Sequence, residues 1–155
     1  MKTFGLFIWA GLLGFLLLAT GCQSSKKPGS SSHASVEIKG HSLDEIRDTT
    51  VVVFAEQGYT LRTNLPGRMT FERPASNGEK FKYGDWMNEG MVMRIKVRIE
   101  EMAENDCLLR ADVYAVQDPM DIYFGEEKRI TLMSAKSYQK MLDDVLRQLE
   151  SPPKN

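Results

Sequence analysis

The chain is poor in the residues that most often carry out chemistry. Among its 155 residues there are only two cysteines and two histidines. His33 and His41 have no predicted rigid element to orient them, so a Ser-His-Asp or Cys-His arrangement has little support. The two histidines also lack metal-ligand spacing with each other or with carboxylates on a predicted element. The sequence therefore predicts no metal site and no histidine-dependent catalytic centre.

An excess of charge of one sign is also missing. Lysine and arginine number 20 against 21 aspartate and glutamate residues, which gives a formal net charge of −1. Such a balance gives no electrostatic reason to expect a nucleic acid or another acidic polymer as partner. No P-loop or dinucleotide-binding fingerprint is present either, so no cofactor is expected.

What the chain does have is a distinctive amino terminus. Lys2 provides one positive charge, and the stretch from Phe4 to Gly21 contains no charged residue. Small residues, Thr20 and Gly21, close this apolar run directly before Cys22. A basic start, an apolar stretch and small residues before the cleavage point are typical of a secretory signal peptide over residues 1–21. With a cysteine directly after it, this segment resembles the signal of bacterial lipoproteins.

The resemblance implies a lipid anchor. In that family the cysteine thiol, here that of Cys22, receives a diacylglyceryl group, and the signal is cut before the cysteine, whose new amino terminus is acylated. Gln23 in the next position favours the outer membrane, facing the periplasm, if the source has two membranes. Ala19 departs from the family, which most often has leucine there. Two alternatives stay open: an uncleaved membrane-spanning helix, and a signal cut elsewhere.

Lipidation of Cys22 would leave Cys107 as the only free thiol, which excludes an internal disulfide and a cysteine-based zinc site. Residues 22–41 are rich in serine, lysine and glycine and are expected to form a flexible tether. Twenty such residues would reach roughly 25 Å. Residues 42–150 are expected to form one domain, and residues 151–155 a disordered tail.

Helices are predicted at both ends of this domain. Ser42 and Glu45 have the spacing of a capping box, and Gly58 is a plausible stop, so a helix is expected between them. The β-branched run from Thr49 to Val53 favours a strand instead, but both ends of the segment carry helix signals. Apolar residues then recur at helical spacing near the carboxyl terminus, which predicts a second amphipathic helix. They are Tyr138, Met141, Leu142, Val145, Leu146 and Leu149.

Between the helices the pattern is that of strands. Alternation over residues 59–64 and 69–74, around a turn at Leu65–Arg68, predicts a hairpin, and residues 75–79 are expected to be a loop. A second hairpin is predicted over residues 91–116 and a short strand over residues 128–133. The expected fold is therefore α+β: an antiparallel sheet of four to five strands with two amphipathic helices on one face.

Two features are candidates for partner binding. Arg94, Lys96 and Arg98 form a cationic row on the exposed side of one strand, which suits an anionic partner or is a solvated face balanced by Glu100 and Asp112. The segment from Phe81 to Asn88 is rich in residue types that anchor interfaces, or else covers the core. Its candidates are Tyr83, Trp86 and Met87.

These features favour one functional hypothesis over another. The preferred one is a membrane-anchored lipoprotein of the cell envelope that acts as a non-catalytic binding or scaffolding module, with the membrane and an envelope protein as partners. The alternative is a small envelope enzyme that works through carboxylates and arginines, which would show as a deep pocket holding strongly perturbed acids.

Overall fold

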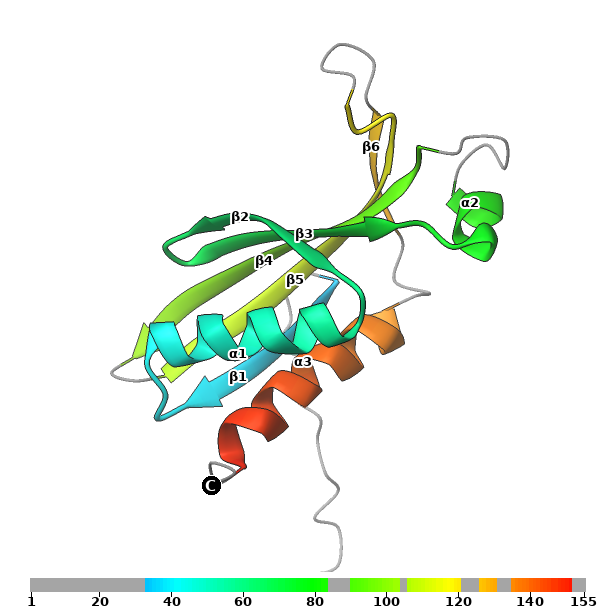
Figure 1. Cartoon of the computed structure of the whole chain (residues 1–155). Helices are drawn as coiled ribbons and strands as arrows, with labels where there is room; N and C mark the ends of the chain where they lie inside the picture. The colour runs from blue at the N-terminus through cyan, green and yellow to red at the C-terminus, as the bar shows by residue number, and fades with distance from the viewer. Residues whose placement is uncertain (1–32, 84–89, 104–105, 121–125, 131–134, 152–155) are drawn as a thin grey trace, which may run out of the picture. The chain divides into compact units, whose positions relative to one another are not determined.

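The computed structural model describes residues 33–83, 90–103, 106–120, 126–130 and 135–151. Within the compact unit Ser31–Asn155, an antiparallel sheet of six strands is covered on one face by helices α1 and α3 (Figure 1). The elements follow the order β1 (Ala34–Lys39), α1 (Leu43–Glu56), β2 (Thr60–Leu65), β3 (Arg68–Pro74), α2 (Asn77–Tyr83), β4 (Val92–Ala103), β5 (Asp106–Gln117), β6 (Glu126–Arg129) and α3 (Ala135–Glu150).

The sheet is built from two hairpins and two additional strands. Its order is β1-β5-β4-β3-β2, and all pairs are antiparallel. β4 occupies one edge of β5, so β1 and β6 share the other edge: β1 pairs with Asp106–Ala111 and β6 with Tyr114–Gln117. The α+β class and the antiparallel sheet are confirmed, whereas four to five strands were too few.

The predicted hairpin turn between β2 and β3 is confirmed. Gly67 has φ +67°, a conformation that favours glycine, as expected at the third position of this turn. The backbone of this turn also lies close to β4. The Ile99 amide donates a hydrogen bond to the Gly67 carbonyl at 2.9 Å. A Cβ on Gly67 would lie 3.3 Å from the Ile99 carbonyl oxygen, so this position leaves little room for a side chain.

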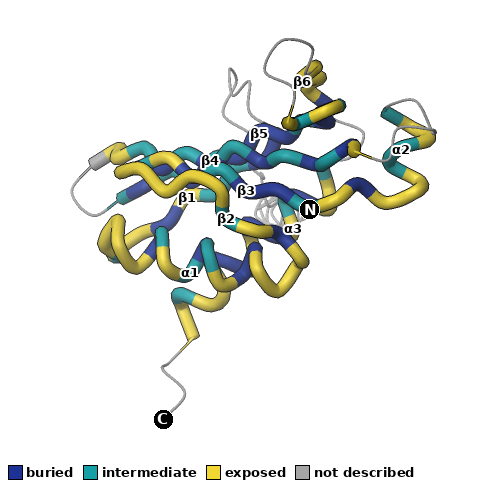
Figure 2. The backbone as a smooth tube through the Cα atoms, turned by 45° about the horizontal axis from the view of Figure 1, so that its top comes forward, coloured by how far each residue is buried: buried dark blue, intermediate teal, exposed yellow. Residues whose placement is uncertain are grey.

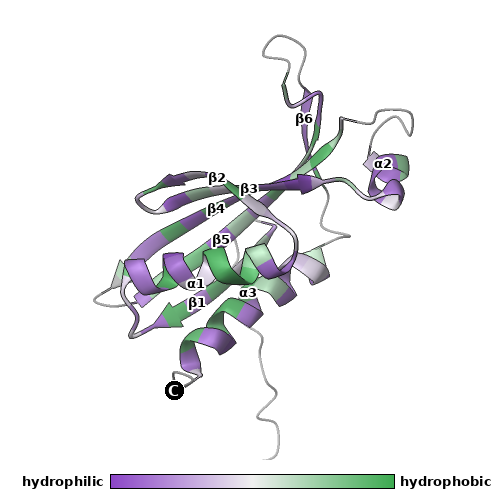
Figure 3. Ribbon diagram, viewed as in Figure 1, coloured by the Kyte–Doolittle hydropathy of each residue, from purple (hydrophilic) through white to green (hydrophobic). Residues whose placement is uncertain are grey.

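The alternation along β4 has the register expected from the sequence. Met93, Ile95 and Val97 are buried, and Arg94 and Lys96 between them are less buried. Buried and partly exposed positions therefore alternate along the strand (Figure 2), as do apolar and polar residues (Figure 3). In β5 the inward residues are Leu109, Ala111, Val113 and Ala115. Because side chains alternate across a strand, this period-two pattern places one apolar face toward the helices.

Helix α1 begins and ends as its sequence predicts, and the strand alternative for Thr49–Val53 is wrong. The Glu45 amide donates to Ser42 Oγ at 3.3 Å, and the Ser42 amide donates to Glu45 Oε2 at 2.8 Å, which completes the capping box. At the other end Gly58 has φ +79°, and Tyr59 N–H donates to the Phe54 carbonyl at 3.0 Å. These contacts form a Schellman motif that satisfies the last carbonyls of the helix.

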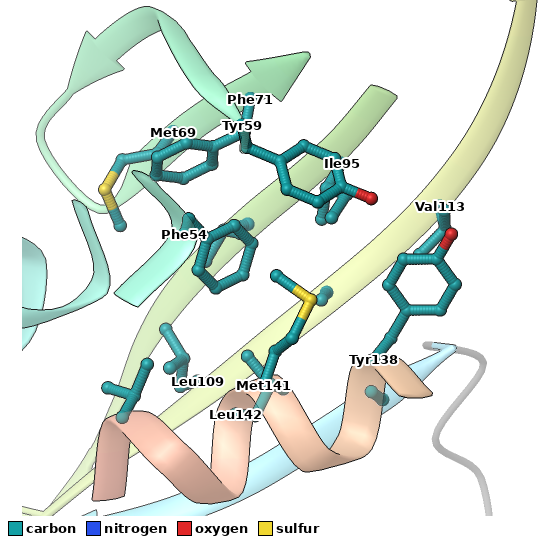
Figure 4. Close-up of a cluster of buried hydrophobic side chains, with 14 of the residues drawn as sticks. Phe54, Tyr59, Met69, Phe71, Ile95, Leu109, Val113, Tyr138, Met141 and Leu142 are labelled. Atoms are coloured by element: carbon teal, nitrogen blue, oxygen red, sulfur yellow. The ribbon is translucent and has the colours of Figure 1, made fainter. Parts of the chain in front are cut away.

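Helix α3 closes the core. Its buried residues are Tyr138, Met141, Leu142 and Val145, the inward positions that the sequence predicts. Figure 4 shows Tyr138, Met141 and Leu142 close to Phe54 of α1 and to inward side chains of β3, β4 and β5. Phe54 and Phe71 are in ring contact, with centroids 4.6 Å apart. The core is therefore a single layer of apolar side chains between the two helices and the sheet.

Three expectations for individual segments were wrong. The tether predicted over residues 22–41 contains β1, whose Ala34 and Ile38 are buried, so the domain begins before residue 42. The loop predicted over residues 75–79 contains the start of helix α2. The short strand expected at 128–133 lies at Glu126–Arg129 instead, and residues 131–133 fall outside the described ranges.

Candidate functional site

Cys22, the expected lipid attachment site, lies outside the described residues, as does the whole segment 1–21. None of the helices within the described ranges has the length and apolar character needed to cross a bilayer. The lipid anchor thus stays a prediction from the sequence.

The cationic row on β4 is paired with carboxylates from neighbouring strands. Arg94 lies 2.6 Å from the Glu72 carboxylate on β3, and Lys96 lies 2.8 Å from the Glu127 carboxylate on β6. Arg98 Nη2 donates to Asp112 Oδ2 on β5 at 2.9 Å. The cations of this row are therefore already in ion pairs within the sheet.

Glu72 and Asp112 are central to this arrangement, because each forms ion pairs with two arginines. Glu72 also accepts from Arg62 Nε at 3.0 Å, and Asp112 also accepts from Arg129 on β6. Although both lie on the face away from the helices, Glu72 is only 8% exposed and Asp112 7%. The long arginine side chains cover the carboxylates. This geometry favours the interpretation of a balanced outer face over that of an anion-binding row.

The expected aromatic loop is helical where it is described. Tyr83 is the last residue of α2, is half-buried and packs against the core. Its ring lies 4.9 Å from Lys82 Nζ. Phe81, on the same short helix, is 80% exposed. Trp86 and Met87 lie outside the described residues, so their expected role in partner binding stays a prediction.

A cleft of about 410 Å³ lies where α2 faces the end of α1 and the start of α3. Its lining residues come from three regions far apart in the sequence, which only the fold brings together. They are Gln57, Tyr59, Arg73, Ser76, Gly78, Glu79, Lys82, Tyr83, Ser137, Tyr138 and Met141. Of the residues proposed from sequence that the structure describes, only Tyr83 belongs to it.

Arg73 and Glu79 form a bidentate ion pair in the cleft wall. Arg73 Nη1 and Nη2 donate to the two Glu79 carboxylate oxygens at 2.9 and 2.7 Å. The Ser76 amide and hydroxyl donate to Glu79 Oε2 at 2.9 and 2.8 Å, and the Glu79 amide donates to Ser76 Oγ at 3.3 Å. Burial raises the pKa of Glu79, but the hydrogen bonds from Arg73 and Ser76 outweigh it, so the net pKa is lowered. Glu79 is therefore ionised at neutral pH, and both its oxygens are occupied.

Two tyrosine hydroxyls lie beside this ion pair. Figure 4 shows the Tyr59 and Tyr138 rings approaching from the sheet side and from α3, with their hydroxyls directed toward the same region. Burial raises the pKa of both phenols, and Tyr59 raises that of Tyr138 further, so both stay protonated. Tyr59 is 5% exposed, and its Oη is buried. Although Arg73 and Tyr138 lie close to it, no group in the described part of the chain makes a hydrogen bond of normal geometry with Tyr59 Oη.

The neighbourhood of Tyr138 also corrects the expectation for His33. His33 is buried, and its amide donates to the Ala111 carbonyl at 3.1 Å. Its ring packs edge-on against the Tyr138 ring, with centroids 5.4 Å apart. His33 therefore has rigid neighbours, contrary to its expected place in a flexible tether.

One sequence signal for the cleft was missed. Ser76 and Glu79 have the same S-x-x-E spacing as Ser42 and Glu45, and both pairs form capping boxes. Asn77 and Gly78 between them were interpreted as a loop tip, because these residues are frequent in turns. The capping box predicts the start of α2, but no local pattern predicts that Arg73 binds Glu79.

Cys107 is buried in β5. Burial raises the pKa of its thiol, and nearby Glu101 and Asp106 raise it further, so the thiolate is disfavoured. Within the described ranges, no three histidine, cysteine or acidic side chains come together in a way that could ligate a metal ion. No protein-family model matches the chain, and a search of curated proteins finds no similar sequence.

Proposed function

We propose that the chain is a bacterial envelope lipoprotein, anchored through acylated Cys22, whose domain is a non-catalytic binding or scaffolding module. The observation that carries the anchor is the position of Cys22, directly after Thr20 and Gly21 at the end of an uncharged apolar run. Several acyl chains would hold the protein firmly, because each buried methylene adds about 0.8 kcal/mol. With Gln23 after the cysteine, the proposed location is the outer membrane, facing the periplasm, in a bacterium with two membranes.

The position of β1 shortens the spacer proposed between Cys22 and the domain. The first residue of β1, Ala34, is about twelve residues after Cys22, and a random chain of that length has a root-mean-square end-to-end distance of roughly 20 Å. The proposed spacer is therefore shorter than the one expected over residues 22–41. A partner of the domain would lie close to the membrane that holds Cys22.

The titrating groups of the cleft support binding rather than catalysis. A general acid or base works best with a pKa near the working pH. In the cleft the Glu79 pKa is lowered, and the pKa values of Tyr59 and Tyr138 are raised above the usual value for a phenol, so all three move away from neutrality. A carboxyl that acts as a general acid near neutral pH would need a raised pKa, the opposite of the shift of Glu79.

Acylation is tested by growing producing cells with a fatty-acid probe. The wild-type protein is expected to be labelled and to lose residues 1–21, whereas Cys22→Ser should be neither labelled nor cut. Cys107→Ser is the matched control, since it removes the only other thiol and should leave labelling unchanged. Labelling that persists in Cys22→Ser, or a wild-type protein that keeps its first 21 residues, would contradict the proposed anchor.

A further inference from the structure

We infer that a row of three arginines, which crosses the sheet on the face away from α1 and α3, binds phosphate headgroups of the membrane that holds Cys22. The row consists of Arg68 on β3, Arg98 on β4 and Arg110 on β5, which are direct partners in the strand register. This inference rests on the proposed lipid anchor and names the surface through which the domain contacts the membrane.

The arginine row is an exception on a face where cations are otherwise paired with carboxylates across strands. Direct partners in an antiparallel pair share a face, with Cβ atoms about 5 Å apart, and like charges at that distance destabilise the sheet. Arg98 has an arginine as its direct partner on both neighbouring strands. The row therefore carries an electrostatic cost that a bound anion would reduce.

Only the middle arginine of the row has a short ion pair. Arg98 Nη2 donates to Asp112 Oδ2 at 2.9 Å, and Asp112 is shared with a further arginine. Arg110 Nε lies 3.4 Å from Glu100 Oε2 and makes no hydrogen bond within the described ranges. Arg68 is exposed, and its side chain has neither an ion pair nor a hydrogen bond in the described part of the chain.

Two carboxylates lie near the Arg110 end of the row. One is Glu100, and the other is Glu37 of β1, which is the register partner of Leu108 and so lies one position along the same face. The positive charge of the row is therefore concentrated toward Arg68, beside the turn between β2 and β3. Arginine suits phosphate in particular, because its planar guanidinium can donate two parallel hydrogen bonds to the phosphate oxygens.

The point where the proposed spacer enters the sheet indicates the membrane as the source of the phosphate. Ser35 of β1, the strand that follows the spacer, is the register partner of Arg110 and continues the row. From β1 to β3 the row crosses three interstrand spacings, roughly 14 Å, which is less than the roughly 20 Å of the spacer. No helix in the described ranges covers this face (Figure 1). An open cationic face beside the anchor is suited to an anionic lipid surface.

The test uses the full chain, purified from bacterial membranes, in lipid nanodiscs that contain a trace of lipid with a gadolinium-chelating headgroup. Relaxation of backbone amides in NMR spectra then shows which residues lie near the headgroups. In phosphatidylglycerol discs we expect the strongest relaxation in β3, β4 and β5 around the row. It should be weaker in discs of zwitterionic phosphatidylcholine and should decrease at high salt.

Two substitutions of Arg68 make the test specific. Arg68→Gln should lower the ratio of membrane-bound to unbound domain about fivefold, as for one cation at an anionic surface, with no fall in melting temperature. Arg68→Glu should lower the ratio further but raise the melting temperature, because it places a carboxylate opposite Arg98. The control is Arg47→Gln, which removes the same charge from α1 and should leave headgroup contact unchanged.

Three results would overturn the inference: no relaxation of the row above that of α1 and α3, equal relaxation in phosphatidylcholine discs, or unchanged contact in Arg68→Glu. Amide shifts at the row with inorganic phosphate in detergent, without headgroup contact in discs, would also overturn it, because the phosphate would then come from a soluble molecule. The intact mass of the same sample shows separately whether Cys22 is acylated. An acylated protein whose row stays away from the headgroups therefore refutes this inference and leaves the proposed anchor intact.

Discussion

The two faces of the sheet are made from alternate residues of the same strands but are stabilised in different ways. Toward the helices, Ile95 and Val97 are at most 1% exposed and belong to the apolar core. On the opposite face, Lys96 lies between them in sequence and is paired with Glu127. One face is held by removing apolar area from water, and the other by matching charges across strands.

The difference is not simply one between buried and exposed residues. Glu72 and Asp112 on the charged face are as inaccessible to water as several residues of the core. Each is covered by two arginines, which keep their guanidinium groups at the surface and cover the carboxylates with their side chains. A sheet face that no helix covers can therefore bury carboxylates beneath arginine side chains. The equal numbers of acidic and basic residues in the sequence are consistent with such pairs but do not locate them.

The largest effect is expected from exchanging the chemistry of the two faces. Val97→Asp would place an unpaired charge among the helices and β4, at a cost of several kcal/mol, which approaches the stability of a small domain. Thermal unfolding followed by circular dichroism should show a domain that is largely unfolded at 25 °C. The control is Lys96→Gln, which removes one exposed ion pair and should cost under about 1 kcal/mol. Equal losses in the two variants would refute the assigned register of β4.

A smaller effect is expected from neutralising one carboxylate of the charged face. Asp112→Asn keeps the shape of the side chain but directs amide hydrogens at Arg98 or Arg129. We therefore expect the free energy of unfolding to fall by about 1–3 kcal/mol. Chemical denaturation measures the change. Asp118→Asn, in the bend after β5, is a control that should have little effect. If Asp112→Asn were also neutral, the ion pairs would contribute nothing, and the charged face would be an ordinary solvated surface.

The smallest and most local effect concerns pH at the cleft. The pKa of folded Glu79 lies below its usual value of 4.5, so its stabilising contribution is complete above that pH and is lost as the pH falls through the lowered pKa. Hydrogen exchange of the α2 amides should therefore accelerate below about pH 4.5, relative to that of the core strands. Glu79→Gln should accelerate exchange already at pH 7 and remove most of this pH dependence. An unchanged α2 in Glu79→Gln would show that the bidentate pair with Arg73 does not hold the helix.

Much of the fold could be predicted because its signals are local. The alternation of β4, the capping box of α1 and the helical spacing of α3 each depend on a few neighbouring residues. Strand β1 also has such a signal, because Ala34, Val36 and Ile38 alternate with polar residues, but the serine-rich surroundings favoured a tether. Strand β1 is held in place by pairing with β5 and by Gln139 of α3, whose side-chain amide hydrogen-bonds with the Ser35 backbone.

By itself, then, the sequence determined the α+β class and the two faces of the central strands, and it carries the prediction of an anchor at Cys22, because charge, apolar runs and periodicity are properties of short segments. Only the tertiary structure decided the cleft. Tyr59 follows α1, while Arg73, Glu79 and Tyr138 belong to β3, α2 and α3, and the arrangement of these segments forms the cleft. Likewise, the sequence placed Arg94, Lys96 and Arg98 in one row and put Asp112 across from it, but only the cross-strand register brought Glu72 and Glu127 beside them.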